Sequence, residues 1–234
     1  MLKLYSFFPA FGLVDASPFV VKVDLYLRAA GLEFLRVPGI RNMRRAPKGK
    51  LPYITDGETI VPDSAFIISY LKAEYGDALD GGLTAEQKAI THAFTKMLDE
   101  NLYWCIVHDR WINDACWPTV KREFFGGLPW PLRVLAPMGA QKRVTKTLYM
   151  HGLGRHSDDE ILEIAKRDLK ALSDYLGDKE WFFGRGPTTL DVAAFAFASG
   201  LIIPPLKSRM TDAARSFTNL ERFVQRVKSK YYPA

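Results

Sequence analysis

Two patterns of hydrophobic and polar positions divide the chain, and one gives way to the other near residue 76. Before that point, short runs rich in leucine, isoleucine, valine and tyrosine predict four strands, at 2–6, 32–37, 51–55 and 59–61. Asp56-Gly57 separates the last two runs and predicts a tight hairpin. Helical spacing of apolar residues predicts one helix from Ser17-Pro18 to a stop at Gly31, and another after Asp63-Ser64. We therefore predict a small mixed sheet with one parallel crossover and one hairpin.

After a glycine-rich linker the pattern turns helical. Two capping boxes, at 84–87 and 157–160, predict helices that extend to about Asn113 and to Leu176. A very apolar helix is expected from 188–191 onward, and an amphipathic one over 220–227. Four prolines between 118 and 137 predict an irregular section. The predicted fold class is α/β followed by all-α, with domains 1–76 and 84–234 joined by a linker at 77–83.

Pro52 lies at the start of a predicted core strand, where its missing N–H is awkward. A cis Leu51–Pro52 peptide accounts for this position, since cis bonds are chiefly a proline phenomenon. A trans proline on an edge strand is the alternative.

Composition narrows the class of protein. The 234 residues are 48% hydrophobic and 25% charged, which is typical of a globular protein with a sizeable core. Cys105 and Cys116 are too few for a disulfide framework or a zinc site, and the four histidines are dispersed, so we expect no metal. The longest apolar stretch, 192–205, is too short for a membrane span, and the N-terminus lacks the pattern of a signal peptide. These features predict a cytoplasmic protein with no membrane partner.

The net charge of +6 is unevenly placed, because basic residues gather at 36–50 and at 121–155, where Glu123 is the single acid. Such segments attract nucleic acid, acidic lipid or small anions, but they are most often solvated loops. No sequence signature of a nucleic-acid-binding motif accompanies them, so we expect no nucleic-acid partner.

Polar residues at two predicted helix starts are candidates for binding an anion. Ser17 and the pair Asp63-Ser64 each precede a helix, where unpaired N–H groups and the helix dipole favour negative charge. Plain helix capping explains them equally well. The predicted strand order places them and Pro52 at one edge of the sheet. Tyr103, Trp104 and Trp111 are expected in the helical core, with the alternative that a stripe of aromatic residues lines an apolar pocket facing the first domain.

These motifs resemble the glutathione S-transferase superfamily. The resemblance is carried by the following segments: Ser17-Pro18-Phe19, GKLPYI at 49–54, Asp63-Ser64 with IISYL at 67–71, Phe183-Gly184, and Thr188-Thr189-Leu190-Asp191. It covers essentially the whole chain. Two further segments, DLKALSDYLGDKEWFFG and NLERFVQRVKSKYYP, look more like the failed-axon-connections and metaxin-like branch of that superfamily.

The resemblance implies a thioredoxin-like domain that holds glutathione and a helical-bundle domain that forms the second-substrate pocket. It assigns roles to the following positions: the Leu51 backbone to the cysteinyl part of glutathione, Pro52 to a cis peptide, Asp63 and Ser64 to the γ-glutamyl end, and Lys50 to the glycyl carboxylate. Ser17 stands where thiol oxidoreductases of this fold carry cysteine, and Tyr5 competes with it as thiol activator. The expected pocket residues are Phe11, Tyr103, Trp104 and Trp111.

The function implied by the resemblance is the conjugation of glutathione, as co-substrate, to a small apolar electrophile by a detoxifying homodimer. Two alternatives remain open at this point. One is a non-catalytic binding or interaction module, as in metaxin-like components of membrane import machinery. The other is a glutathione-dependent reductase or isomerase that shares the same binding site.

Overall fold

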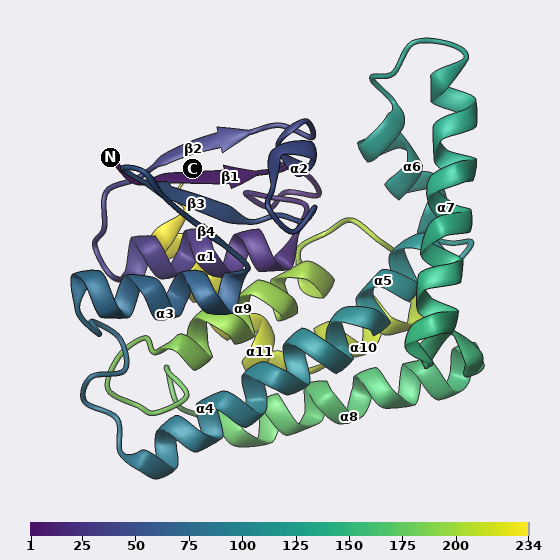
Figure 1. Ribbon diagram of the computed structural model, residues 1–234. Helices are drawn as coiled ribbons and strands as arrows, with labels where there is room; N and C mark the ends of the chain where they lie inside the picture. The colour runs from purple at the N-terminus through teal and green to yellow at the C-terminus, as the bar shows by residue number, and fades with distance from the viewer. Residues whose placement is uncertain (234) are drawn as a thin grey trace.

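A four-stranded sheet in the order β2-β1-β3-β4 begins the fold (Figure 1). The structure is a computed structural model and describes residues 1–233. The strands are β1 (Lys3–Ser6), β2 (Leu35–Pro38), β3 (Tyr53–Asp56) and β4 (Thr59–Pro62). β1 pairs with β2 in parallel and with β3 antiparallel, and β3 and β4 form the hairpin around Asp56-Gly57. The mixed sheet with one crossover is confirmed.

The crossover between β1 and β2 runs through α1 (Pro18–Ala29), and the chain leaves the sheet through α3 (Ser64–Tyr75). Both helices lie on the face of the sheet that is turned toward the rest of the molecule (Figure 1). β2 begins three residues later than the sequence predicts, because the Leu32 N–H donates to Leu27 O at 2.9 Å and continues the helix cap. A short helix, α2 (Asn42–Arg45), interrupts the basic segment at 36–50.

The remainder of the chain is helical, as predicted. Its elements are α4 (Ala85–Met97), η1 (Leu98–Leu102), α5 (Tyr103–Trp111), α6 (Trp117–Phe125), α7 (Leu132–His151), η2 (Leu153–Arg155), α8 (Asp158–Leu176), α9 (Thr189–Ile202), α10 (Arg209–Ser216) and α11 (Thr218–Tyr231). The capping boxes at Thr84 and Ser157 are both formed. The long helix expected to Asn113 is α4 and α5 joined by η1, a π-helical turn.

The section from 117 to 151 is helical except at 126–131, which corrects the expectation of an irregular section drawn from its prolines. Pro118 occupies the first turn of α6, where a proline costs no helical hydrogen bond, and Pro131 precedes α7. Pro137 alone lies inside a helix. The two helices stand together at one side of the molecule, at the right of Figure 1.

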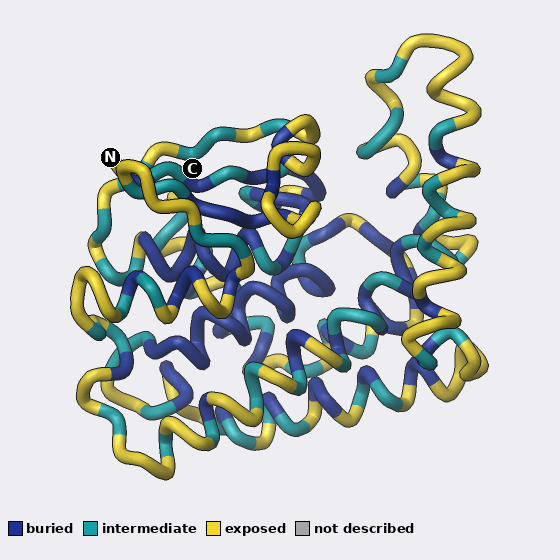
Figure 2. Tube along the Cα trace, viewed as in Figure 1, coloured by how far each residue is buried: buried dark blue, intermediate teal, exposed yellow. Residues whose placement is uncertain are grey.

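The core runs through both parts of the chain. α9 is buried along its whole length and packs against α1, so that it lies between the first domain and the outer helices (Figures 1 and 2). One connected cluster of buried side chains includes Leu4, Val20, Leu102 and Phe197. The first domain therefore has no apolar core separate from that of the second.

Candidate functional site

Strand register brings the candidate residues to one end of the sheet. Tyr5 pairs with Tyr53, and Tyr53 pairs with Pro62, so β1 ends where β3 begins and where β4 leads into α3. The Leu51–Pro52 peptide is cis, as predicted. The Asp63 N–H donates to Pro52 O at 3.3 Å, which joins the cis-proline turn to the start of α3.

Ser17 lies at the N-terminus of α1 with its hydroxyl free of the helix. Its carbonyl oxygen accepts from the N–H groups of Val20 and Val21, but within residues 1–233 its side chain makes no capping hydrogen bond. The Ser17 N–H donates instead to Asp15 Oδ1 at 3.0 Å. The hydroxyl is thus available to a ligand at a helix terminus that carries partial positive charge.

Arg36 holds the loop that leads to Ser17. Its guanidinium donates to Ser6 Oγ at 3.2 Å and to Asp15 Oδ2 at 3.0 Å, and its Nε lies 3.3 Å from Asp24 Oδ2. Burial raises the pKa of Asp15 to about 7, against the lowering effects of the Ser17 N–H and of Arg36. A carboxyl group that titrates near neutral pH is therefore hydrogen-bonded to the backbone of Ser17.

A cavity of about 130 Å³ opens beside Ser17, at the boundary between the two domains. Phe7, Ala16, Ser17 and Pro18 line it from the first domain, and Phe124 of α6 lines it from the second. The remaining lining residues belong to α5, and they are Tyr103, Ile106, Val107, Arg110 and Trp111. Most of the lining residues are apolar or aromatic, and the ones with a polar group in the side chain are Ser17, Tyr103, Arg110 and Trp111.

Two of the four residues predicted for the second-substrate pocket, Tyr103 and Trp111, line this cavity. Phe11 is not among the lining residues but is buried against Phe124, with ring centroids 5.8 Å apart. Trp104 points elsewhere and stacks on His151 of α7 at 4.5 Å.

The residues assigned to glutathione by resemblance differ in exposure. Leu51 and Ser64 are buried, whereas Lys50 and Asp63 are exposed. The Asp63 carboxylate already accepts from the Ala65 N–H at 3.0 Å and so caps α3. Tyr5 stacks on Tyr53 with ring centroids 4.2 Å apart, and it is not among the residues that line the cavity.

Arg110 was not anticipated from the sequence. Its side chain is buried, and it donates to Ala16 O at 3.1 Å and to Gly200 O at 2.8 Å, so carbonyl oxygens rather than a carboxylate receive its hydrogen bonds. Its Nε is buried without a partner among residues 1–233. Burial lowers the pKa of Arg110 to about 10, which leaves it protonated at neutral pH. The cavity wall therefore carries a desolvated positive charge.

Lys22 and Asp99 form a second buried polar contact between the domains. Lys22 Nζ donates to both carboxylate oxygens of Asp99, at 2.7 and 2.8 Å. Burial pushes the pKa of Lys22 down and that of Asp99 up, while the contact between them opposes both shifts. Asp99 lies in the π-helical turn η1.

Within the part of the chain that the structure describes, no group of three or more histidine, cysteine or carboxylate side chains is arranged to hold a metal ion. Over the same residues, every helix is too short or too polar to cross a membrane.

Comparison with known proteins gives matches to both domains. A family model described as the glutathione S-transferase N-terminal domain matches residues 18–116, and one described as the glutathione S-transferase C-terminal domain matches residues 165–227. The isoprene-epoxide glutathione S-transferase of Rhodococcus sp. (strain AD45) is 32% identical, and the alignment covers 99% of each chain.

Other relatives are longer than this chain. Failed axon connections of Drosophila melanogaster is 38% identical over 100% of this chain, which spans 58% of that protein. Human metaxin-1 is 31% identical over 99% of this chain, which spans 51% of it. Among solved structures, the beta-etherase LigF from Sphingobium sp. strain SYK-6 aligns with a TM-score of 0.68 at 20% identity, covering 97% of this chain and 95% of its own, which shows a shared fold.

Proposed function

Because the chain belongs to the glutathione S-transferase superfamily, we propose that it binds glutathione and conjugates the glutathione thiol to a small apolar electrophile. The observation that carries the proposal is Ser17, which lines a cavity between the domains and whose hydroxyl makes no capping bond within residues 1–233. The 32% identity to an isoprene-epoxide glutathione S-transferase supports the same reaction.

The chemical requirement is a thiolate at neutral pH. A free thiol has a pKa of about 8.5, so only a few per cent of it is ionised. A hydrogen bond from a hydroxyl to an anion contributes about 1.5–3 kcal/mol and a helix N-terminus up to about 1 kcal/mol, enough together to lower that pKa by about two units. In this protein Ser17 supplies the hydroxyl and α1 the helix terminus.

We propose an epoxide as the electrophile, the class named in the Rhodococcus relative. The thiolate sulfur attacks a ring carbon, the C–O bond breaks, and the oxygen leaves as an alkoxide that takes up a proton. The product is a hydroxythioether, and the proton count balances because the thiol has released one proton. Arg110 places a buried positive charge on the cavity wall, where it would stabilise the developing alkoxide.

Glutathione itself is proposed to lie along the edge of the sheet beyond the cis-proline turn. Leu51 offers its backbone to the cysteinyl part, Ser64 and Asp63 receive the γ-glutamyl end, and Lys50 pairs with the glycyl carboxylate. The exposure of Lys50 and Asp63 leaves both charges accessible to a ligand.

Calorimetric titration with glutathione tests this assignment. Lys50→Ala and Asp63→Ala should each weaken binding by roughly 1–3 kcal/mol, the loss expected for one charge-assisted hydrogen bond. Asp63→Asn retains a side-chain oxygen to cap α3, so it separates loss of charge from loss of the cap. Lys88→Ala removes an exposed lysine from α4 and serves as the control. Unchanged affinity in both Ala variants would reject these residues, and no binding by the wild type would reject the function.

A non-catalytic binding or interaction module is the second candidate. It is favoured by the 38% identity to failed axon connections and by the identity to metaxins. Turnover of a panel of apolar epoxides separates the two functions, because a binding module would bind glutathione without consuming it.

Thiol–disulfide exchange by the chain's own cysteines is disfavoured. Cys105 and Cys116 are buried, and burial raises the pKa of each thiol to about 12, so neither is a ready nucleophile.

We also propose that the protein is a homodimer at micromolar concentration, which light scattering would test.

A further inference from the structure

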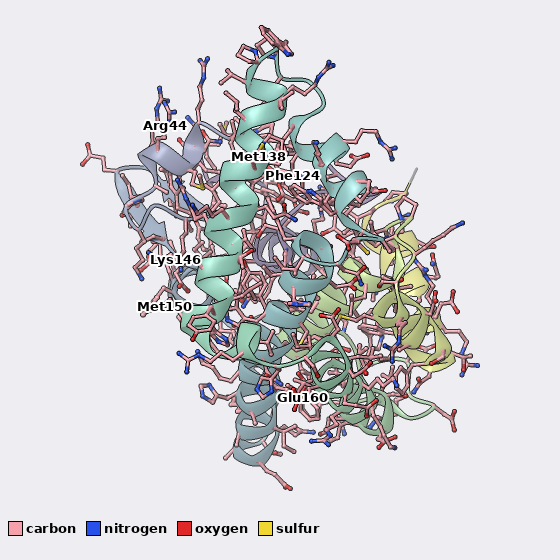
Figure 3. All side chains as sticks on the ribbon, turned by 90° about the vertical axis from the view of Figure 1, so that its right-hand side faces the viewer. Arg44, Phe124, Met138, Lys146, Met150 and Glu160 are labelled. Carbon is pink, nitrogen blue, oxygen red and sulfur yellow. The ribbon has the colours of Figure 1, made fainter. Side chains whose placement is uncertain are left out.

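The outer face of α7 is apolar and exposed. The large hydrophobic residues of α7 whose exposed fractions lie between 52% and 70% are Leu132, Leu135, Met138, Tyr149 and Met150, and Trp130 just before the helix is 78% exposed. In Figure 3 α7 faces the viewer, and Met138 and Met150 lie along it. Scattered apolar residues are normal on a protein surface, but a contiguous set on one helix indicates an interaction site.

The same segment carries the net charge of the protein. Residues 121–155 contain seven lysines and arginines and one acid, Glu123. The net charge of this segment is therefore +6, the same as the net charge of the whole chain. The rest of the molecule is therefore neutral overall, since acidic residues elsewhere balance the basic segment at 36–50, whereas the positive charge of α6, α7 and the turn that follows them is not balanced within that segment.

Helical geometry interleaves the two kinds of side chain. Lys142 lies seven residues after Leu135 and four after Met138, and Lys146 follows four residues later, so these positions share one side of α7. Lys142 and Lys146 are exposed, and no residue of α7 is acidic. The α7 face, which we define as Leu132, Leu135, Met138, Lys142, Lys146 and Met150, is thus apolar and cationic at once.

We propose that the α7 face docks on an anionic lipid surface, with α7 lying in the plane of the interface. Its apolar side chains would enter the headgroup region while its lysines pair with lipid phosphates. Trp130, two residues before α7 and 78% exposed, has the amphipathic ring that favours the membrane interface. This proposal is independent of the conjugation of glutathione.

Two other occupants of such a face match it in only one of its two features. In a two-fold dimer built on it, each face would meet its own copy, and lysines would approach lysines without an intervening acid. An acidic protein would match the lysines, but its acidic surface would offer no apolar contact to the exposed leucine and methionine side chains. A lipid surface satisfies both features, since it is anionic outside and apolar beneath.

Vesicle flotation with the full-length protein tests the proposal. We expect binding to vesicles of phosphatidylcholine with 30% phosphatidylglycerol, and little binding to phosphatidylcholine alone. A lysine near an anionic membrane contributes roughly fivefold in affinity, so Lys142→Glu/Lys146→Glu should reduce partitioning at least tenfold. Leu135→Ser/Met138→Ser should reduce it as well, because the apolar contribution is lost while the charge is kept.

Matched substitutions elsewhere serve as controls. Lys88→Glu reverses an exposed lysine on α4, and Ile60→Ser removes an exposed apolar residue from β4. Both should bind anionic vesicles like the wild type. Failure of the wild type to bind, or equal loss in the control variants, would overturn the proposal. Sedimentation showing a dimer that the α7 variants convert to monomer, without vesicle binding, would assign the face to a second copy instead.

Discussion

At the scale of single residues, Ser17 illustrates what a sequence can and cannot show. Ser17-Pro18 marks the start of a helix correctly, and both a cap and a ligand contact fit that pattern. The choice depends on Asp15, whose carboxylate accepts the Ser17 N–H, and on a hydroxyl with no cap bond within residues 1–233. The hydrogen bond between Asp15 and Ser17 is local, but the Asp15 side chain is also held by Arg36 from β2, 21 residues away, and local spacing does not show that contact.

The first prediction concerns the activation of the thiol. Ser17→Ala should raise the pKa of bound glutathione by at least one unit and slow conjugation at least tenfold, because the hydroxyl hydrogen bond to the thiolate is lost. Tyr5→Phe should have the smaller effect, since Tyr5 stacks on Tyr53 and is not among the residues that line the cavity. Thiolate absorbance as a function of pH measures the first effect and steady-state kinetics the second. Identical titration curves in Ser17→Ala and wild type would leave Ser17 without a role in activation.

The pKa of Asp15 predicts a pH dependence of stability. Burial raises this pKa from 3.8 to about 7 in the folded protein, so between these values the folded state binds one proton more than the unfolded state. Raising the pH through that window therefore costs the folded state stability. Relative to Asp15→Asn, the wild type should lose roughly 2–3 kcal/mol of unfolding free energy between pH 5 and pH 8.

Urea unfolding of the two proteins at several pH values measures this difference. Asp168 and Asp191, whose pKa values are both raised to about 6 by burial, are present in both proteins, so their contributions cancel. Parallel curves of stability against pH would show that Asp15 remains ionised throughout.

At the scale of elements, the strands, the hairpin and the capping boxes follow from local chemistry, and the sequence predicts them well. The prolines between 118 and 137 mislead because their effect depends on position. Pro118 lies in the first turn of α6, where a proline costs no helical hydrogen bond, and Pro131 precedes α7, so only Pro137 lies inside a helix. The wall of the cavity was predictable in principle. The spacing of one helical face connects four lining residues of α5, which are Tyr103, Ile106, Val107 and Arg110. This spacing places the charged Arg110 on the same face as the aromatic Tyr103.

The contact between α1 and η1 predicts a strong coupling between two charges. Lys22→Met should destabilise the protein by about 3–5 kcal/mol, because it leaves the Asp99 carboxylate buried without its partner. Lys22→Met/Asp99→Leu should cost less than that, since neither charge then remains in the core. Chemical denaturation of the single and double variants completes the cycle.

An exposed pair on α8 provides the comparison. Lys170 and Asp174 are 2.7 Å apart but both are largely solvated, so Lys170→Met should leave the stability nearly unchanged. If the double variant at Lys22 and Asp99 were less stable than either single variant, the buried pair would be contributing through packing rather than through charge.

At the scale of the whole molecule, composition and patterning correctly predict an α/β part followed by a helical part, but not how the two parts depend on each other. α9 is buried all round because α1 and the outer helices cover it from different sides. Arg110 adds hydrogen bonds that join the loop before α1, through Ala16 O, to α9, through Gly200 O. These contacts join residues some 90 positions apart, and no periodicity in the sequence reports them.

The shared core predicts that both parts unfold in one transition. Separating them would expose the faces of α1 and α9 that contain Val20 and Phe197, so neither part retains its apolar burial without the other. Hydrogen exchange in increasing urea, followed by mass spectrometry, should show peptides from β1, β3 and α9 losing protection at the same midpoint. Peptides from the largely exposed α7 should exchange at lower urea and so provide an internal reference. Two distinct midpoints for β1 and α9 would mean that the sheet and the helical domain are independently stable, contrary to the continuous core.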